Sequence, residues 1–323
     1  MGEANTLRAS NDIRQTAQAT LTVNEVDQLA DGSLGVLKGT SGASVGDQAA
    51  YETRGQFTCP KLTGIEFLDG GRAYWSFPDN AISFRRSGNR DFYAGRIVGN
   101  AASADTVCVV NVNVSEAGYD VDLRKDAFLS TPTGTPAAGG FGIPKHVGGS
   151  SSLELTATTE AQCVDLLSVD RFDVVANPIL EAIIRVTSNG SGGTVDFNIG
   201  LANGTSTTDA DAITEHVLIH FDGGSTAIKV QSKDGVTTVA ATDTTKTFTA
   251  GSGASNRTEV WIDARQPENV KVYVNAVRVL SATTFRIDNA VGPLGALAHL
   301  EKTTGADTGK YVVDRLSVRS AQQ

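Results

Sequence analysis

The sequence is poor in the residues on which most catalytic and metal sites depend. Its 323 residues include only 3 cysteines and 4 histidines, and aromatic residues make up 6% of the chain. Cys59, Cys108 and Cys163 are odd in number and far apart in the sequence, which excludes a disulfide framework. No apolar run is as long as the ~18 residues that a membrane-spanning helix needs, so we expect none.

The chain also lacks a concentration of positive charge. Its formal net charge is -9, and residues 151–323 carry 14 basic and 20 acidic side chains. Without a basic stripe, nucleic acid is not an expected partner. The N-terminal stretch MGEANTLRASNDIRQ has no apolar core and does not resemble a secretory signal. We therefore expect a soluble protein that is made in a cytoplasm and has no membrane contact.

What the sequence has in quantity is glycine, threonine, serine, valine and alanine, with 34 glycines. This composition is typical of short strands joined by tight turns, and it predicts an all-β fold. The length suits two domains. We predict an extended arm over 1–20, a small β-barrel or β-sandwich over 21–115, a linker rich in proline and glycine over 116–152, and a larger β-domain over 153–323.

The larger domain shows the clearest strand pattern. Val270, Val272 and Val274 alternate with polar residues, as expected for a strand with one buried face. About eleven such segments follow one another, which predicts a jelly-roll sandwich. The segment YDVDLRKDAFL before the proposed linker fits either a strand or a short helix.

Cysteine and histidine do not form a recognisable site in the sequence. Cys59 precedes Pro60, and all four histidines lie beyond residue 140, so we interpret Cys59 as a buried residue at a strand end. His216 and His220 lie in a strand-like run, where residues four apart are about 13 Å from each other, too far for one metal ion. We interpret them as surface or hydrogen-bonded histidines, and we expect no metal or other cofactor.

The segment EVWIDAR resembles the acidic strand of jelly-roll glucanases in part. Glu259, Trp261 and Asp263 share a face, but the two acids are about 13 Å apart. Glycoside hydrolysis needs about 5–9.5 Å between its carboxyl groups, so we do not expect an enzyme.

Glycan binding is an alternative function. Trp261 and Tyr273 could stack on sugars, and Asp209 and Asp211 could bind calcium. The other interpretation is that these aromatic residues fill the core and that the two acids belong to a solvated turn.

Residues 31–114 resemble the small head-decoration proteins of tailed bacteriophages, the lambda type and its relatives. The resemblance depends on Gly55, Phe57, Pro60 and Lys61, then on the segment GRAYW, and then on a closing strand pair that ends in DTVCVVNVN. The C-terminal part is similar to concanavalin-like or laminin-G-like jelly rolls, through EVWIDARQPENVKVYVNAVRVL and YVVDRLSV.

The first resemblance implies a structural protein on the outer surface of a virion. Such a protein stabilises the capsid as a homotrimer at threefold positions, with the major capsid protein as its partner. Leu7, Ile13 and Arg14 of the arm would contact the capsid by adding a strand to an exposed edge. A glycan-binding module on a virion or cell surface is the alternative.

Overall fold

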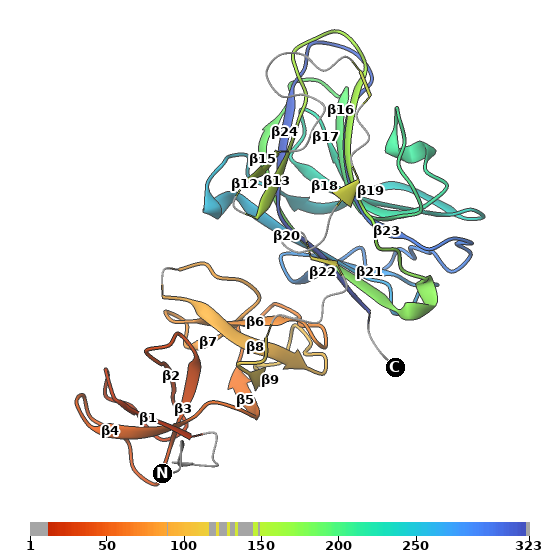
Figure 1. Cartoon of the computed structure of the whole chain (residues 1–323). Helices are drawn as coiled ribbons and strands as arrows, with labels where there is room; N and C mark the ends of the chain where they lie inside the picture. Colours follow the sequence, from red (N-terminus) through yellow and green to blue (C-terminus); the bar gives the residue numbers. More distant parts are fainter. Residues whose placement is uncertain are drawn as a thin grey trace, which may run out of the picture. The chain divides into compact units, whose positions relative to one another are not determined.

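The computed structural model describes residues 12–88, 90–115, 121–122, 128–129, 133–134, 145–147 and 149–320. The chain forms two compact units, residues 1–117 and 118–323 (Figure 1). Each unit consists of β-strands joined by turns and loops, apart from three short 3-10 helices in the larger unit.

The smaller unit contains two antiparallel sheets. The first has the order β1-β4-β3-β2 and is formed by β1 (Asp12–Thr16), β2 (Val26–Gln28), β3 (Leu34–Lys38) and β4 (Gln48–Glu52). The second has the order β5-β9-β8-β6-β7 and is formed by β5 (Gln56–Pro60), β6 (Arg72–Ser76), β7 (Ala81–Ser83), β8 (Phe92–Val98) and β9 (Val107–Val112). Strand alternation buries Ala49 and Tyr51 on one face of β4, where they join a small cluster with Leu21, Leu29 and Leu37.

Part of the predicted extended arm is a strand of this unit. Residues 12–16 form β1, which pairs in antiparallel register with β4, so that Ile13 lies opposite Tyr51. An edge strand obtains hydrogen bonds from its neighbour and needs few apolar side chains, so its polar composition was misleading. Leu7 lies outside the described residues.

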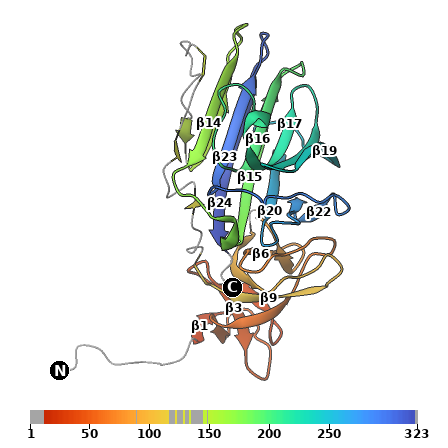
Figure 2. The ribbon, with the colours of Figure 1, turned by 90° about the vertical axis from the view of Figure 1, so that its right-hand side faces the viewer.

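The larger unit is a two-sheet sandwich (Figure 2). Its seven-stranded sheet contains, in spatial order, β11 (Phe128–Leu129), β14 (Gln162–Ser168), β23 (Gly295–Lys302), β16 (Val195–Ala202), β17 (Glu215–Asp222), β18 (Ala227–Asp234) and β19 (Thr238–Thr247). Its eight-stranded sheet contains β12 (Lys145–Val147), β13 (Ser150–Glu154), β24 (Gly309–Ser320), β15 (Pro178–Asn189), β20 (Arg257–Asp263), β21 (Lys271–Val274) and β22 (Val277–Val279), with β10 (Val121–Asp122) paired to β24. The 3-10 helices are η1 (Val174–Ala176), η2 (Ala210–Ala212) and η3 (Ala254–Asn256).

The core of the sandwich consists of alternate residues from the facing sheets. Phe197 and Ile199 of β16 and Val260 and Ile262 of β20 are fully buried in one cluster. Tyr311 of β24 stacks on Phe197 with ring centroids 4.3 Å apart. The predicted fold class is therefore confirmed: an all-β chain with a small N-terminal pair of sheets and a larger jelly-roll sandwich. Among the described residues, no helix is long and apolar enough to cross a membrane.

The segment predicted as a linker contributes strands to the larger unit. Three strands, β10, β11 and β12, lie within residues 116–152. β10 pairs with β24, β11 pairs with β14, and β12 pairs with β13. Two parts of the segment YDVDLRKDAFL are strands, β10 near its start and β11 at its end. The proline and glycine content did not reveal these strands, because each one is only two or three residues long, and β10 and β11 depend on partners distant in the sequence.

Candidate functional site

Polar side chains gather on the face of the seven-stranded sheet that points away from the core. Since Val164, Phe197, Phe221 and Leu300 pack into the core, the residues next to them in β14, β16, β17 and β23 point to the other side. We call the following set the polar face: Cys163, Asp165, Asp196, Asn198, His220, Asp222, Lys229, His299 and Glu301.

The strand register arranges the polar face in two rows. Neighbouring strands place the members of the first row directly opposite one another, in the order Asp165, His299, Asn198, His220 and Lys229. The second row runs alongside it in the order Cys163, Glu301, Asp196 and Asp222. Directly opposite residues in a sheet have Cβ atoms about 4.5–5.5 Å apart, so these side chains can interact along each row.

One end of the polar face, on β16, β17 and β18, is open to solvent. His220 Nε2 lies 2.7 Å from Asp222 Oδ1, and Lys229 Nζ lies 2.5 Å from Asp222 Oδ2. The side chains of Asp222 and Lys229 are 27% and 29% exposed. Asp196 stands opposite Asp222, and one ligand atom each from Asp196, His220 and Asp222 lie within 4.8 Å of one another. We call these four residues the open end.

The two carboxyl groups of the open end titrate differently. Burial raises the pKa of Asp196 to about 6, and the neighbouring His220 opposes this shift. Burial also acts to raise the pKa of Asp222, but hydrogen bonds from Lys229 and His220 outweigh it and lower that pKa. Near neutral pH, Asp222 is therefore firmly ionised, whereas Asp196 is poised close to its titration.

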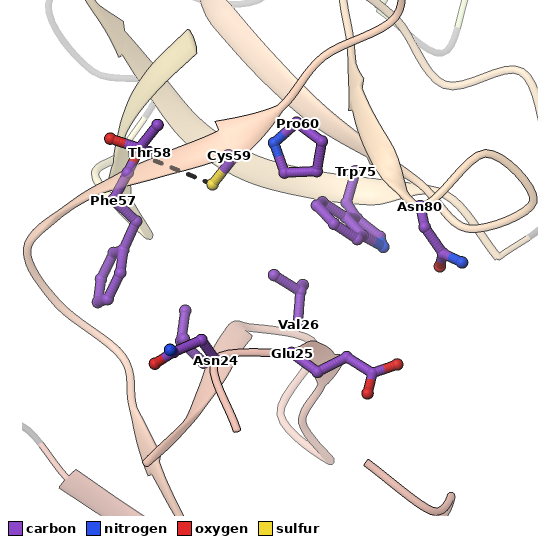
Figure 3. A pocket seen from close by; sticks show the side chains of 10 residues that line it. Asn24, Glu25, Val26, Phe57, Thr58, Cys59, Pro60, Trp75 and Asn80 are labelled. Carbon is purple, nitrogen blue, oxygen red and sulfur yellow. Dashed lines mark hydrogen bonds between the residues drawn. The ribbon is translucent and has the colours of Figure 1, made fainter. Parts of the chain in front are cut away.

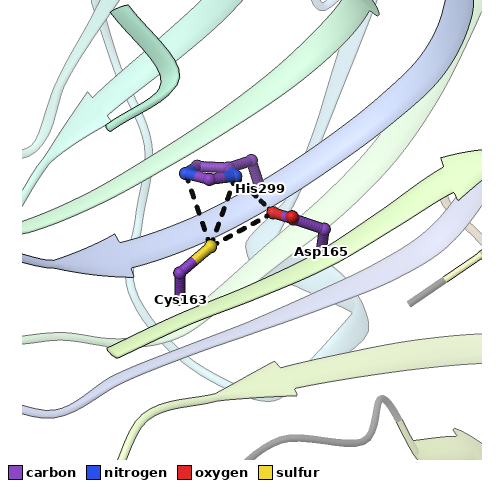
Figure 4. Close-up of side chains that lie close together, drawn as sticks. All are labelled: Cys163, Asp165 and His299. Carbon is purple, nitrogen blue, oxygen red and sulfur yellow. Dashed lines mark hydrogen bonds and ion pairs between the residues drawn. The ribbon is translucent and has the colours of Figure 1, made fainter. Parts of the chain in front are cut away.

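The other end of the polar face, on β14 and β23, is closed. Cys163, Asp165 and His299 are fully buried, and Glu301 is 2% exposed. Figure 4 shows the Cys163 thiol beside the imidazole ring and the Asp165 carboxylate in contact with His299 Nδ1. On the far side of the ring, His299 Nε2 lies 2.5 Å from Glu301 Oε2. We call these four residues the buried end.

Burial and hydrogen bonding both shift the pKa values of the buried end. Burial alone would lower the pKa of His299, but hydrogen bonds with Asp165, Cys163 and Glu301 raise it well above its ordinary value. Burial raises the pKa of the Glu301 carboxyl, and the bond to His299 opposes this. Burial also raises the pKa of the Cys163 thiol to about 11, so this thiol is protonated at neutral pH.

Asn198 lies between the two ends and is buried. Its Oδ1 atom accepts a hydrogen bond across 2.9 Å from His220 Nδ1. Its Nδ2 atom has no hydrogen-bond partner among the described residues. A buried amide N–H without a partner costs free energy, and such a group often marks a place where a ligand or a water molecule accepts a hydrogen bond.

The loop of residues 203–213 covers part of this face. Ala210 and Ile213 pack with Leu167, Leu218 and Leu297 of the sheet in a second small apolar cluster, which also includes Ala202. The backbone N–H of Ala210 donates to Glu301 Oε1 at 3.3 Å. The loop is therefore held on the sheet by both apolar packing and a polar contact.

Asp209 and Asp211, which the sequence suggested as calcium ligands, belong to this loop. Asp209 Oδ1 accepts from the Asp211 backbone N–H at 2.7 Å and so caps η2. Asp211 Oδ1 accepts from Gln231 Nε2 at 2.7 Å. These contacts give the two acids a structural role at the start of η2.

Trp261 and Tyr273 lie on the eight-stranded sheet, not on the polar face. They are 6% and 3% exposed, and their ring centroids are 5.8 Å apart. The Trp261 indole N–H donates to Glu259 Oε1 at 2.9 Å, and the same oxygen accepts from Arg315 at 2.7 Å. Rings with so little exposed surface offer no platform for a sugar, which argues against the glycan contact proposed for them.

The two histidines that the sequence placed on one strand are both buried. His216 Nδ1 lies 3.1 Å from the Ile213 carbonyl oxygen, and burial lowers the His216 pKa to about 4. His220 belongs to the open end. The interpretation of hydrogen-bonded histidines is confirmed, and the alternative of surface histidines is wrong.

Cys59 is a buried residue near the end of β5, as expected. It lies opposite Cys108 of β9, and burial raises its thiol pKa to about 11. Beside it is a cavity of about 420 Å³ within the smaller unit, lined by Phe57, Trp75 and Val26 among others (Figure 3). Among the described residues, the Cys59 thiol donates its one hydrogen bond to the Phe57 carbonyl oxygen across 3.8 Å, and no base accepts from it.

Sequence reasoning missed most of the polar face, although a signal was present. Four apolar strands each carry two polar residues at alternate positions, in the segments CVD, DFN, HFD and HLE. One such pair is unremarkable. Four of them in strands of one domain indicate a polar stripe, because each pair interrupts a strand that is otherwise buried on both faces.

No protein-family model matches the chain, and no curated protein matches it. Among solved structures, it is similar to LamAcat from Zobellia galactanivorans, with 10% identity over 63% of this chain and 98% of that one and a TM-score of 0.44. It is also similar to the Emp47p carbohydrate recognition domain, with 10% identity over 65% and 100% of the two chains and a TM-score of 0.42. A β-1,3-glucanase from Mycobacterium marinum matches with 10% identity over 63% and 100% and a TM-score of 0.41. Nothing in these comparisons supports a phage decoration protein, and at these identities the likeness concerns fold alone.

Proposed function

We propose that this chain is a glycan-binding protein and that the open end of the polar face contacts the sugar. The observation that carries the proposal is the ordered set of hydrogen-bonding groups at Asp196, His220, Asp222 and Lys229, of which the Asp222 and Lys229 side chains are 27% and 29% exposed. The Asp196 carboxylate can accept hydrogen bonds from sugar hydroxyls and the Lys229 ammonium group can donate to them, while Asp222 holds His220 and Lys229 in place. These side chains already hold one another in place, which reduces the entropy lost on binding.

The charge of the open end favours neutral sugars. Asp222, Asp209 and Asp211 are close enough to Asp196 for their charges to raise its pKa. The nearby cation, Lys229, is paired with Asp222. An anionic sugar would meet repulsion from several carboxylates, so we expect neutral hexose oligosaccharides to bind in preference to sialylated or sulfated ones.

Binding without cleavage fits the state of Asp222. One of its oxygens faces His220 and the other faces Lys229, so the carboxylate is already engaged on both sides. A glycosidase nucleophile or base must present a free oxygen to the sugar or to a water molecule. We therefore expect no reducing sugar to be released from a bound oligosaccharide.

A glycan array probed with the full chain tests the proposal. We expect wild-type protein to bind neutral oligosaccharides and Lys229→Ala to lose about tenfold in affinity, the equivalent of one hydrogen bond to a charged group. The matched control is Lys246→Ala, which removes an exposed lysine from β19 of the same sheet. The proposal is wrong if no glycan binds, or if both variants weaken binding equally.

Head decoration of a bacteriophage is a second candidate, supported by the edge strand of the smaller unit. β1 ends the order of its sheet, its Ile13 side chain is 39% exposed, and the neighbouring Arg14 is also exposed. An open edge of this kind can add a strand from another protein, such as a major capsid protein, and bind the virion surface as a homotrimer.

Co-sedimentation with undecorated phage heads tests this second candidate. Saturable binding of the full chain, weakened by Ile13→Asp or by deletion of residues 1–11, is the expected result. The matched control is Val45→Asp, which changes an exposed apolar residue of the same unit outside any strand. If heads sediment without the protein, the decoration hypothesis fails and glycan binding is untouched.

A further inference from the structure

Three potential metal ligands meet at the buried end of the polar face. One ligand atom each from Cys163, Asp165 and His299 lie within 4.8 Å of one another, and all three residues are fully buried. Cys163 Sγ lies 3.7 Å from His299 Nδ1 and 3.4 Å from Asp165 Oδ1. Asp165 Oδ1 and His299 Nδ1 are in direct contact.

The two separations from the sulfur are close to the edges of a zinc tetrahedron. Zinc–sulfur bonds of about 2.3 Å and zinc–nitrogen or zinc–oxygen bonds of about 2.0 Å imply ligand edges of about 3.5–3.6 Å from the sulfur. The two measured sulfur edges, 3.7 and 3.4 Å, lie on either side of this value. Cys163 Sγ also lies 3.8 Å from His299 Nε2, so the imidazole must turn to direct Nδ1 at an entering ion, and the contact between Asp165 and His299 must open.

The surroundings offer a candidate fourth ligand and an orienting group. The Ser206 carbonyl oxygen lies 3.3 Å from Cys163 Sγ, close to the length of another tetrahedral edge. Glu301 Oε2 faces His299 Nε2, the ring nitrogen that a metal at Nδ1 leaves free. A carboxylate in that position fixes the histidine tautomer and orientation in many zinc sites.

Zinc binds cysteine as the thiolate and histidine through an unprotonated ring nitrogen. Binding at Cys163 Sγ therefore releases the thiol proton to solvent, and zinc affinity should fall at low pH.

We propose that Cys163, Asp165 and His299 bind a structural zinc ion, with the Ser206 carbonyl oxygen as fourth ligand. The set of one sulfur, one nitrogen and two oxygens in a tetrahedral arrangement suits zinc, whereas calcium and magnesium require a shell of oxygen ligands. Because Ser206 belongs to the loop that covers the sheet, the ion fastens this loop to β14 and β23. The inference depends on the buried end alone and is independent of the proposed glycan function.

The experiment uses the full chain, stripped with a chelator and then titrated with Co²⁺ as a spectroscopic probe. We expect one Co²⁺ per chain with a thiolate-to-metal charge-transfer band in the near ultraviolet, which added Zn²⁺ abolishes. Cys163→Ala should lose the band. The matched control, Cys108→Ala, removes another buried strand cysteine and should keep it. Glu301→Gln should keep the band and weaken zinc binding about 10- to 100-fold.

A second measurement does not require Cys163→Ala to fold. X-ray absorption at the zinc edge of the loaded Cys108→Ala protein should show one sulfur ligand and otherwise nitrogen or oxygen. Zinc should also raise the melting temperature of wild-type protein, since it binds only the folded state. Absence of the cobalt band in folded wild-type protein, its persistence in Cys163→Ala, or a zinc shell without sulfur would overturn the proposal.

Discussion

The two ends of the polar face contain the same kinds of side chain in different surroundings. Each end places an imidazole beside carboxylates, through His220 at the open end and His299 at the buried end. Asp222 of the open end is 27% exposed, whereas Asp165 of the buried end is fully buried. Water partly screens the charges of the open end and forms hydrogen bonds with them, and a ligand can replace this water. The buried end depends on complete internal pairing, as a structural centre does.

The strongest test of this difference is to remove each histidine in turn. His299→Leu leaves the Asp165 and Glu301 carboxylates buried without their cationic partner, and we expect a loss of about 3–5 kcal/mol in the free energy of unfolding. His220→Leu removes the pair with Asp222, which water partly screens, and should lower the free energy of unfolding by about 1 kcal/mol. Urea unfolding in the presence of a chelator measures both without a metal contribution. Equal losses would contradict the contrast between the ends.

A smaller effect concerns the pH dependence of stability at the open end. The pKa of Asp196 is about 6 in the folded protein and 3.8 in the reference state, so the folded state binds this proton more tightly. The free energy of unfolding therefore falls as the pH rises through the window from 3.8 to about 6. Asp196→Asn should remove about 1 kcal/mol of this fall, a value discounted because the carboxyl is partly exposed.

The measurement is the difference between wild-type and Asp196→Asn unfolding free energies across that window. His216 has a lowered pKa of about 4 and contributes with the opposite sign, since the unfolded state binds its proton more tightly. This contribution is common to both proteins and cancels in the difference. A difference that does not change with pH would show that Asp196 titrates normally.

The contrast also explains how far the sequence could lead. Alternation along strands predicted the sandwich, and it placed Glu259 and Trp261 on one face, as the structure has them. It could not predict which strands become neighbours. Cys163 and Glu301 are opposite each other only because β14 pairs with β23, from the far end of the domain. Sequence motifs defined by residue spacing detect ligands that are close in sequence, so they cannot detect a site that is assembled by such long-range strand pairing.

Trp261 and Tyr273, which the sequence offered as possible glycan contacts or as core residues, are 6% and 3% exposed. Aromatic type suggested a sugar platform, but exposure depends on what packs against a strand. The open end contains no phenylalanine, tyrosine or tryptophan, and its polar residues lie in strands that are otherwise apolar. Composition therefore indicated the fold class well and the exposure of individual side chains poorly.

The smallest expected effect on stability is that of Lys229→Ala, and it sharpens the comparison by its salt dependence. Lys229 and Asp222 form a partly exposed ion pair at 2.5 Å, so the loss should be at most about 1 kcal/mol in low salt. In about 1 M salt, where screening acts over about 3 Å, we expect the difference from wild type to disappear. Urea unfolding at the two salt concentrations measures this. The loss for His299→Leu should persist in high salt, because salt screens charges buried this deeply much less than exposed ones. If Lys229→Ala lowered the free energy of unfolding equally at both salt concentrations, solvent would not reach the open end, and the proposed sugar contact would lose its support.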